Sequence, residues 1–267
     1  KGAVLGAVLG LPLLAAVLWL MERMGPMWWL YVWLTWVGFN LLVLVLYPTL
    51  IAPLFNRFSP LQDESLRGRI EALLAKCGFR SKGLFVMDGS KRSSHGNAYF
   101  TGLGASKRIV FFDTLLSRLA PAEVEAVLAH ELGHFRRRHV LKRIVWLFAA
   151  SLAFLALLGY LIDQPWFYAG LGVASTGTAM ALALFFLVIP VFTFLLHPLG
   201  SLYSRKHEYE ADAYAAEHAS ATDLVRALVK LYQDNAATLT PDPLHSAFYD
   251  SHPPASLRVA RLQALAR

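Results

Sequence analysis

The sequence has few charged residues and almost no cysteine, and both shortages restrict what the chain can be. Only 16% of its 267 residues are Asp, Glu, Lys or Arg, while 56% are hydrophobic. Soluble domains have about 25% charged residues, so this chain is too apolar for an ordinary soluble protein. The single cysteine, Cys77, excludes an internal disulfide, and its position in an apolar helical pattern favours a buried, unreactive thiol.

Long apolar segments account for the shortage of charge. Four of them approach the roughly 20 residues that a helix needs to cross a bilayer. They run from about 2 to 21, 28 to 50, 144 to 162 and 177 to 199, and Pro190 predicts a kink in the last one. A buried soluble helix is the alternative for any one segment, but four in one chain favour a multi-pass membrane protein.

The charges that remain are unevenly placed. Between Asn56 and Arg143 there are 16 Lys and Arg against 8 Asp and Glu, whereas the turn after the third apolar segment carries only Asp163. Because positively charged loops stay on the cytoplasmic side, we expect the middle segment and the C-terminal tail to be cytoplasmic. The net charge of +7 therefore requires no nucleic acid as a partner, and membrane lipids are the expected surroundings.

One short motif indicates a metal site. The run His130-Glu131-Leu132-Gly133-His134 reads H-E-x-x-H, and residues four apart share one face of a helix. Two imidazoles can therefore reach one zinc ion, while Glu131 beside them can take a proton from the attacking water. Gly133 is a poor helix former and predicts a close approach of another backbone. A chance match on an ordinary amphipathic helix is the alternative.

Two acids further along the chain complete the predicted site. A zinc peptidase needs a third protein ligand and one coordination position for water. Glu208 and Asp212 are four residues apart, so both can face the same metal from one helix. We expect Glu208 to bind the metal and Asp212 to accept a hydrogen bond from a ligand histidine. Glu210 should point about 200 degrees away from Glu208, toward solvent or a basic neighbour. A solvated charged helix is the alternative.

The middle segment alternates between helical and strand patterns. A helix is expected from Pro60 to Phe79, and one side of it carries Leu66, Ile70, Leu73, Leu74 and Cys77. Strands are expected from Gly83 to Met87, Asn97 to Thr101 and Arg108 to Asp113, with a turn at 102–106 between the last two. The predicted fold class is mainly α, with multi-pass membrane helices and a small α+β zincin-like catalytic domain that contains a short β-sheet.

These patterns divide the chain into four stretches. Residues 1–55 are expected to form two transmembrane helices, and residues 56–143 the catalytic α+β segment with the H-E-x-x-H helix. Residues 144–203 are expected to form two further transmembrane helices, and residues 204–267 a C-terminal catalytic segment.

The order of the motifs resembles a known family. The sequence has HELGH, then EYEAD after a membrane span, then SHPP near the end, as in the M48 metallopeptidases. The runs DGSKRSSHGNAYFTG and PTLIAPLFNRFSPL resemble the Ste24 type of that family, the CAAX prenyl protease 1 group. Enzymes of this type have more membrane spans than the four visible here, which implies that the chain is a fragment lacking N-terminal spans.

The resemblance implies a role for each matching residue. It implies one zinc ion per chain on His130, His134 and Glu208, with Glu131 as the catalytic base. It also implies that Asp212 supports a ligand from behind.

The resemblance also covers three residues outside the predicted metal ligands, and two of them have a simple structural explanation as an alternative. The resemblance implies that Asn97 binds substrate near the scissile bond, and that His252 and Arg258 stabilise the oxyanion or hold substrate. Asn97 begins a predicted strand, where a turn residue is equally expected. His252 precedes two prolines, where a helix start is natural and a capping residue is the alternative.

The expected function is that of an integral-membrane zinc metalloendopeptidase. Its substrates would be prenylated CAAX-like peptides or other membrane-associated chains. The first alternative is an HtpX-like protease that cuts misfolded membrane proteins, and the second is a catalytically inactive structural or transport protein of the membrane. The expected location is a bacterial inner membrane, or the endoplasmic reticulum if the chain is eukaryotic.

Overall fold

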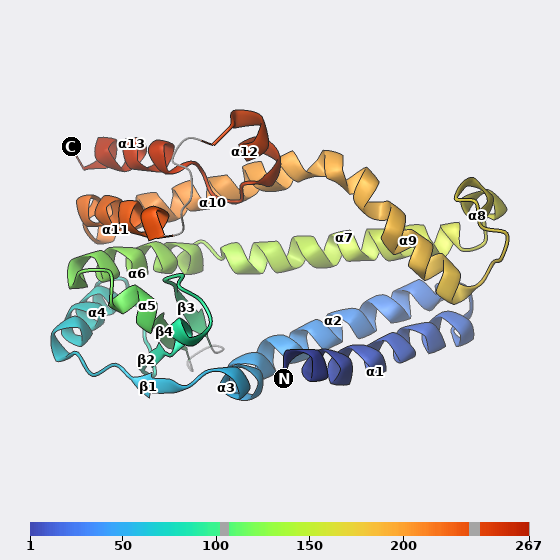
Figure 1. The fold of residues 1–267 in the computed structure, drawn as a ribbon, viewed down its shortest axis with the longest axis horizontal. Coiled ribbons are helices and arrows are strands. Elements are labelled where there is room, and N and C mark those ends of the chain that lie inside the picture. The colour runs from blue at the N-terminus through green and yellow to red at the C-terminus, as the bar shows by residue number, and fades with distance from the viewer. Residues whose placement is uncertain (102–106, 235–240, 267) are drawn as a thin grey trace. The chain divides into compact units, whose positions relative to one another are not determined.

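The computed structural model describes residues 1–101, 107–234 and 241–266 (Figure 1). The chain forms two compact units. One comprises Lys1–Leu46 and Leu141–Leu196, and the other comprises Tyr47–Val140 and His197–Arg267. The turn expected at 102–106 lies outside the described residues.

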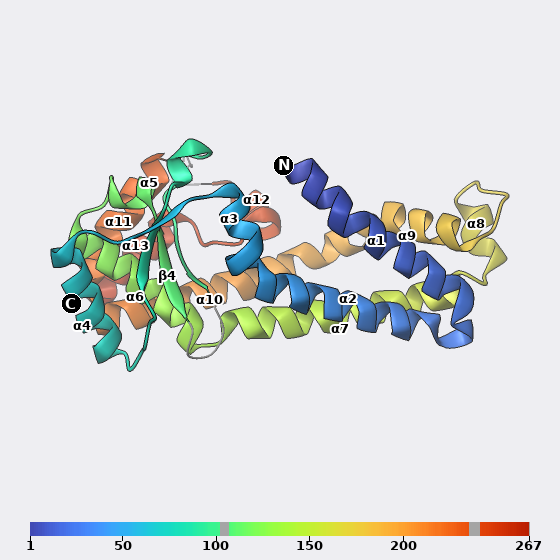
Figure 2. The same ribbon diagram turned by 90° about the horizontal axis from the view of Figure 1, so that it is seen from below.

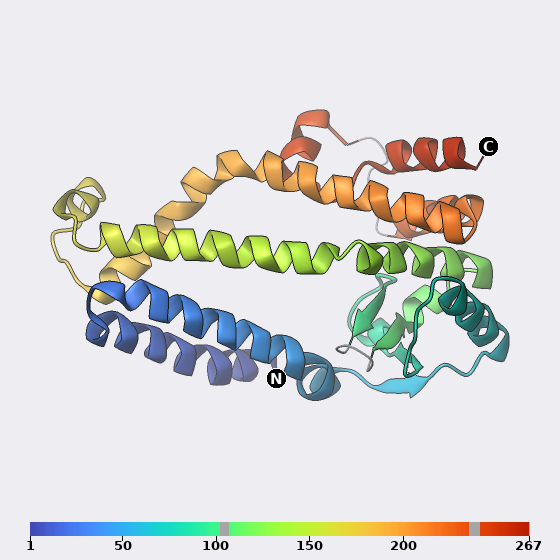
Figure 3. The same cartoon turned by 180° about the vertical axis from the view of Figure 1, so that it is seen from behind.

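The first unit consists of apolar helices. Their bounds are α1 (Gly2–Arg23), the 3-10 turn η1 (Gly25–Met27), α2 (Trp28–Leu46), most of α7 (His139–Leu161), α8 (Pro165–Gly170), α9 (Thr178–Thr193) and the 3-10 turn η5 (Phe194–Leu196). Figure 3 shows α1 and α2 side by side. The unit has its own core, in which Trp28, Leu158 and Phe185 are buried together. The indole N–H of Trp33 donates to the carbonyl of Phe148 at 2.9 Å and ties α2 to α7.

The multi-pass prediction is confirmed. Among the residues that the structure describes, four helical stretches are long and apolar enough to cross a membrane, namely Gly2–Arg23, Gly25–Phe55, His139–Leu161 and Thr178–His218. Large apolar side chains on them face outward, as lipid contact requires, and Leu187 is 74% exposed. The last stretch changes from α to 3-10 winding at Phe194–Leu196, a few residues after Pro190.

The second unit contains a four-stranded mixed sheet. Its strands are β1 (Phe58–Pro60), β2 (Leu84–Met87), β3 (Ala98–Thr101) and β4 (Arg108–Phe112), in the order β1-β2-β4-β3. β2 and β4 are parallel, and the other two pairs are antiparallel. Tyr99 pairs with Val110 across the outer pair. Among the described residues, β3 therefore lies at one end of the sheet.

The second unit also contains helices and short helical turns. Their bounds are the π-helical turn η2 (Tyr47–Ile51), α3 (Ala52–Phe55), α4 (Glu64–Lys76), the 3-10 turn η3 (Gly89–Lys91), α5 (Asp113–Leu116), α6 (Pro121–Arg136), α10 (His197–His218), α11 (Ala221–Asp234), α12 (Pro243–Tyr249) and α13 (Ala255–Leu265). Figure 2 shows the strands next to α6, which contacts β3, α4, α10 and α11. The helix expected from Pro60 begins later, because the Asp63 carboxylate accepts from the Leu66 N–H and caps α4.

Close packing of α6 on α10 is the feature that positions the site. A Cβ added at Gly133 would lie 2.9 Å from the Cα of Ala211 and 3.1 Å from the Ala211 carbonyl oxygen. Ala211 and Ala215 on the facing helix are fully buried and equally small. The predicted close backbone approach at Gly133 is thus confirmed. Because α6 and α10 lie so close, His130 on one helix and Glu208 on the other come within 3.5 Å of each other.

Gly133→Ala should therefore destabilise the protein. Overpacking costs about 1–3 kcal/mol, and this outweighs the gain of about 1 kcal/mol in helix propensity. Gly68→Ala on α4 is the matched control, because a Cβ there meets open space. Denaturant unfolding of both variants in detergent should show Gly133→Ala less stable and Gly68→Ala unchanged or more stable than wild type. Equal stability of the two variants would contradict the close approach.

Candidate metal centre

Three side chains from two helices converge in the second unit. His130 and His134 belong to α6 and Glu208 belongs to α10, two helices that pack against each other. The two Nε2 atoms are 3.1 Å apart. Glu208 Oε2 lies 3.5 Å from His130 Nε2, and Glu208 Oε1 lies 3.3 Å from His134 Nε2. The three residues predicted as ligands are thus brought together.

The spacing of these donor atoms suits a zinc ion. With metal–ligand bonds of about 2.0–2.1 Å, tetrahedral ligand atoms lie about 3.3 Å from one another. The two Nε2 atoms are 3.1 Å apart, and a different oxygen of Glu208 lies near each of them, at 3.5 Å and 3.3 Å, which is close to that value. Glu208 Oε2 is also buried and has no hydrogen-bond partner among the described residues, although Arg258 Nη1 lies 3.5 Å from it, so a metal ion would give this oxygen a closer partner. Two imidazoles and one carboxylate form a donor set that zinc takes in peptidases.

Asp212 and Arg258 hold one of these ligands from behind. Nδ1 of His130 is 2.9 Å from Asp212 Oδ1. Arg258 donates to both oxygens of that carboxylate, from Nε at 2.9 Å and from Nη2 at 2.6 Å. Both Asp212 and Arg258 are almost fully buried, which makes the pair hard to break. Asp212 therefore lies where the sequence placed it. Arg258 contacts Asp212, and its role in binding substrate stays a prediction.

The surroundings of α6 favour a positive charge at His130 and raise the pKa of the Glu131 carboxyl group. Burial alone would lower the pKa of His130, but hydrogen bonds to Asp212 and Glu208 raise this pKa to about 9. The two carboxylates therefore favour a positive charge at this imidazole. Burial also raises the pKa of Glu131, although His130 and His134 oppose that shift. A carboxylate with a raised pKa is suited to accept and then release a proton.

His252 also reaches the cluster. Its Nε2 lies 3.5 Å from Glu208 Oε1, and its side chain is 60% exposed. Pro254, not His252, is the N-cap of α13, so the capping alternative does not describe this residue. The loop that carries His252 is fixed from two sides. Arg205 Nη1 donates to the carbonyl of Asp250, and the hydroxyl of Tyr232 donates to the carbonyl of Pro253.

Asn97 occupies a different environment. It is exposed and immediately precedes β3. Its side-chain oxygen accepts from the Ala98 N–H at 2.7 Å, and its carbonyl accepts from the Phe112 N–H at 2.9 Å. These bonds agree with the reading of Asn97 as a turn residue at the start of a strand. Its contact with substrate stays a prediction.

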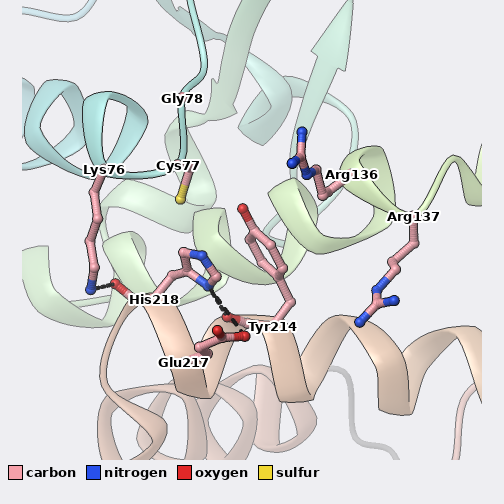
Figure 4. A pocket seen from close by; sticks show the side chains of 8 residues that line it. All are labelled: Lys76, Cys77, Gly78, Arg136, Arg137, Tyr214, Glu217 and His218. Atoms are coloured by element: carbon pink, nitrogen blue, oxygen red, sulfur yellow. Dashed lines mark hydrogen bonds and ion pairs between the residues drawn. The ribbon is translucent and has the colours of Figure 1, made fainter.

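A cavity of about 600 Å³ lies elsewhere in the same unit. Figure 4 shows its lining, which comes from the ends of α4, α6 and α10: Lys76, Cys77, Gly78, Arg136, Arg137, Tyr214, Glu217 and His218. The Lys76 ammonium donates to the carbonyl of His218, and Cys77 is half-buried there. None of the predicted ligands lines this cavity, so the metal centre is a separate feature.

Sequence reasoning missed one histidine at the metal centre. Nδ1 of His139 is 3.0 Å from Nδ1 of His134, and Nε2 of His139 is 3.0 Å from a carboxylate oxygen of Glu210. Glu210 thus points toward a basic neighbour, as predicted. No sequence signal pointed to His139, because arginine is a good helix former and the three arginines before it do not predict the break between Arg136 and His139.

Comparisons with known proteins agree with this geometry. Peptidase family M48 matches residues 60–266, and the CAAX prenyl protease N-terminal family, with five membrane helices, matches residues 1–57. A CAAX prenyl protease 1 homolog of Arabidopsis thaliana is 40% identical over 269 residues, which cover 99% of this chain and 62% of the relative. CAAX prenyl protease 1 of Saccharomyces cerevisiae is 37% identical over 280 residues, covering 98% and 61%.

A solved structure gives the same result. The crystal structure of S. mikatae Ste24p matches with a TM-score of 0.89 and 34% identity, over 98% of this chain and 64% of that one. The chain spans about three fifths of the length of the curated relatives it matches. Together with the H-E-x-x-H helix and the acid on α10, the match over 60–266 shows that this chain belongs to peptidase family M48.

Proposed function

We propose that the chain carries the catalytic site of an integral-membrane zinc endopeptidase of the Ste24 type. The observation that carries this proposal is the convergence of His130, His134 and Glu208: the two Nε2 atoms are 3.1 Å apart, each has a Glu208 oxygen within 3.5 Å, and Glu131 lies on the helix of the histidines. Families of this kind use a metal, and the donor set favours zinc over the harder cations, which prefer oxygen ligands.

In peptide hydrolysis, the metal and two nearby side chains would each have a different role. Bound zinc would supply a Lewis acid that polarises the scissile carbonyl and makes water acidic near neutral pH. Glu131 would take the proton from the attacking water and deliver it to the leaving nitrogen. His252 is mostly exposed and lies 3.5 Å from Glu208, so its Nε2 can donate a hydrogen bond to the developing oxyanion.

The sheet edge suggests how substrate is held. β3 pairs with β4 on one side, and its other edge belongs to no strand among the described residues. An extended peptide can add to such an edge through main-chain hydrogen bonds. We propose that Asn97 contacts substrate from the start of this edge, and that Arg258 serves binding through Asp212 and His130. Residues 56–143 and 204–267 would then act together as the catalytic segments.

The proposed substrates follow from the named relatives. Curated relatives are called CAAX prenyl protease 1, so we propose prenylated CAAX-like peptides or other membrane-associated peptides as substrates. The test combines zinc analysis with cleavage of one peptide in prenylated and unprenylated forms. We expect one zinc per chain and faster cleavage of the prenylated form. Equal cleavage would support a quality-control protease instead, and a protein that binds no zinc after reconstitution would reject both.

The distribution of charge supports a cytoplasmic catalytic unit. We propose that Arg136, Arg137 and Arg138, just before α7, anchor that end of the span on the cytoplasmic side. Single cysteines placed at Arg137 and Ala264 in a Cys77→Ala background should react with an impermeant reagent from the same side of the membrane. Labelling from opposite sides would contradict the proposed orientation.

A further inference from the structure

The two ligand histidines are held in different ways. His130 donates directly to the carboxylate of Asp212, whereas His134 meets another imidazole, that of His139. His139 in turn contacts the carboxylate of Glu210. We propose that His139 and Glu210 form a hydrogen-bonded relay that orients His134 for the metal, an inference that rests on the proposed zinc site.

A break in the backbone makes this contact geometrically feasible. On one continuous helix, residues five apart point about 140 degrees away from each other, so their side chains would not meet. Here α6 ends at Arg136, and α7 begins at His139. Arg138 between them has a φ of 55°, in the left-handed region that a non-glycine residue enters at a cost of about 1–2 kcal/mol. The strained residue redirects the chain so that His139 turns back onto His134.

The direction of each hydrogen bond follows from the metal geometry. His134 directs Nε2 toward Glu208 Oε1 at 3.3 Å, the side where the metal would be bound. Its Nδ1 must therefore carry the proton and donate to Nδ1 of His139 at 3.0 Å. His139 then carries its own proton on Nε2 and donates to Glu210 Oε2 at 3.0 Å. Each ring has one defined tautomer, and the carboxylate at the end fixes both.

Packing holds the middle of the relay in place. His139 is 2% exposed and stacks on His207 with ring centroids 3.9 Å apart and planes 9° apart. Tyr203 meets His207 edge-on at 4.2 Å. A ring confined in this way loses little freedom when it binds, so its Nδ1 stays aimed at His134. Residues that orient metal ligands typically change metal affinity by about 10–100-fold when they are replaced.

Zinc affinity of the full chain, measured by chelator competition, tests the relay without using catalysis. His139→Phe keeps the ring and its stack but removes both nitrogens, and it should weaken zinc binding by about 10–100-fold. His139→Asn returns an amide oxygen near the position of Nδ1 and should bind zinc more tightly than His139→Phe. In the cobalt-loaded protein, the visible absorption bands of His139→Phe should shift, because the coordinated imidazole has lost its orientation.

A matched control comes from another stacked histidine. His218 stacks on Tyr214 with centroids 4.0 Å apart, and it bonds to the Tyr214 carbonyl, away from the ligands. His218→Phe should leave zinc affinity and the cobalt spectrum unchanged. If His139→Phe fails to fold, Glu210→Ala replaces it as the test, because that side chain is 30% exposed and its loss spares the core. Glu210→Ala should weaken zinc binding by about three- to tenfold, less than the loss of the residue in direct contact.

The outcomes separate the relay from the zinc site itself. If the wild-type protein binds no zinc, the proposed function fails. If it binds one zinc and His139→Phe binds equally tightly, only the relay is overturned. Equal weakening in the Phe and Asn variants would show that a hydrogen-bond acceptor near the position of Nδ1 does not support His134, and it would also overturn the relay.

Discussion

Replacing Glu131 with glutamine should abolish peptidase activity while leaving the metal bound. Glu131 lies on α6 between the two ligand histidines but is not one of the three ligands. Glu131 is half-buried, and its loss of contact with water raises the pKa of its carboxyl group, which suits proton transfer. Glutamine has the same shape and cannot accept the proton. We expect peptide cleavage to fall to background, with zinc content equal to that of wild type.

The same assay separates the base from the proposed oxyanion donor. His252→Ala should also keep its zinc, but it should slow turnover by on the order of a hundredfold rather than abolish it. The reason is that His252 is an exposed side chain that assists the metal, whereas Glu131 supplies the only proposed base. Substantial turnover in Glu131→Gln would reject the proposed mechanism. Loss of zinc from that variant would instead mean that Glu131 contributes to the metal site.

Helical periodicity explains why the ligands could be predicted. His130 and His134 are four residues apart, and so are Glu208 and Asp212, so each pair shares a face whatever the rest of the fold does. The strands could be predicted for a similar reason, because β2, β3 and β4 consist of short apolar and aromatic runs bounded by polar turns. The helical spacing and the strand patterns are both local features of the sequence, and the structure contains the helices and strands that they predicted.

Contacts that depend on a break in periodicity could not be predicted. His139 meets His134 only because Arg138 adopts a positive φ, and no propensity rule expects arginine in that conformation. β1 has three residues including Pro60, which is too short for a strand pattern. The ion pair between Arg258 and Asp212 joins residues 46 positions apart in the sequence, so only the packing of α13 against α10 reveals it. These contacts depend on tertiary structure, so they could not be predicted from the sequence.

Two neighbouring acids on α10 should differ sharply in their importance for metal binding. Glu208 is almost fully buried and faces both ligand histidines, at 3.5 Å from His130 and 3.3 Å from His134. Glu210 points to the other side of the helix and meets His139. Residues two apart on a helix differ by about 200 degrees, so the two acids cannot both bind one metal.

Glu208→Gln should therefore weaken zinc binding by at least about a hundredfold, because it removes a charged ligand. For comparison, replacing a residue that only orients a ligand lowers metal affinity by about 10–100-fold. Glu210→Gln should change zinc affinity by less than about threefold, because the glutamine oxygen can still accept the hydrogen bond from His139. Chelator competition on both variants measures this difference directly. The reverse order, or equal losses, would show that α10 is rotated about its axis from the orientation described and that Glu208 is not the third ligand.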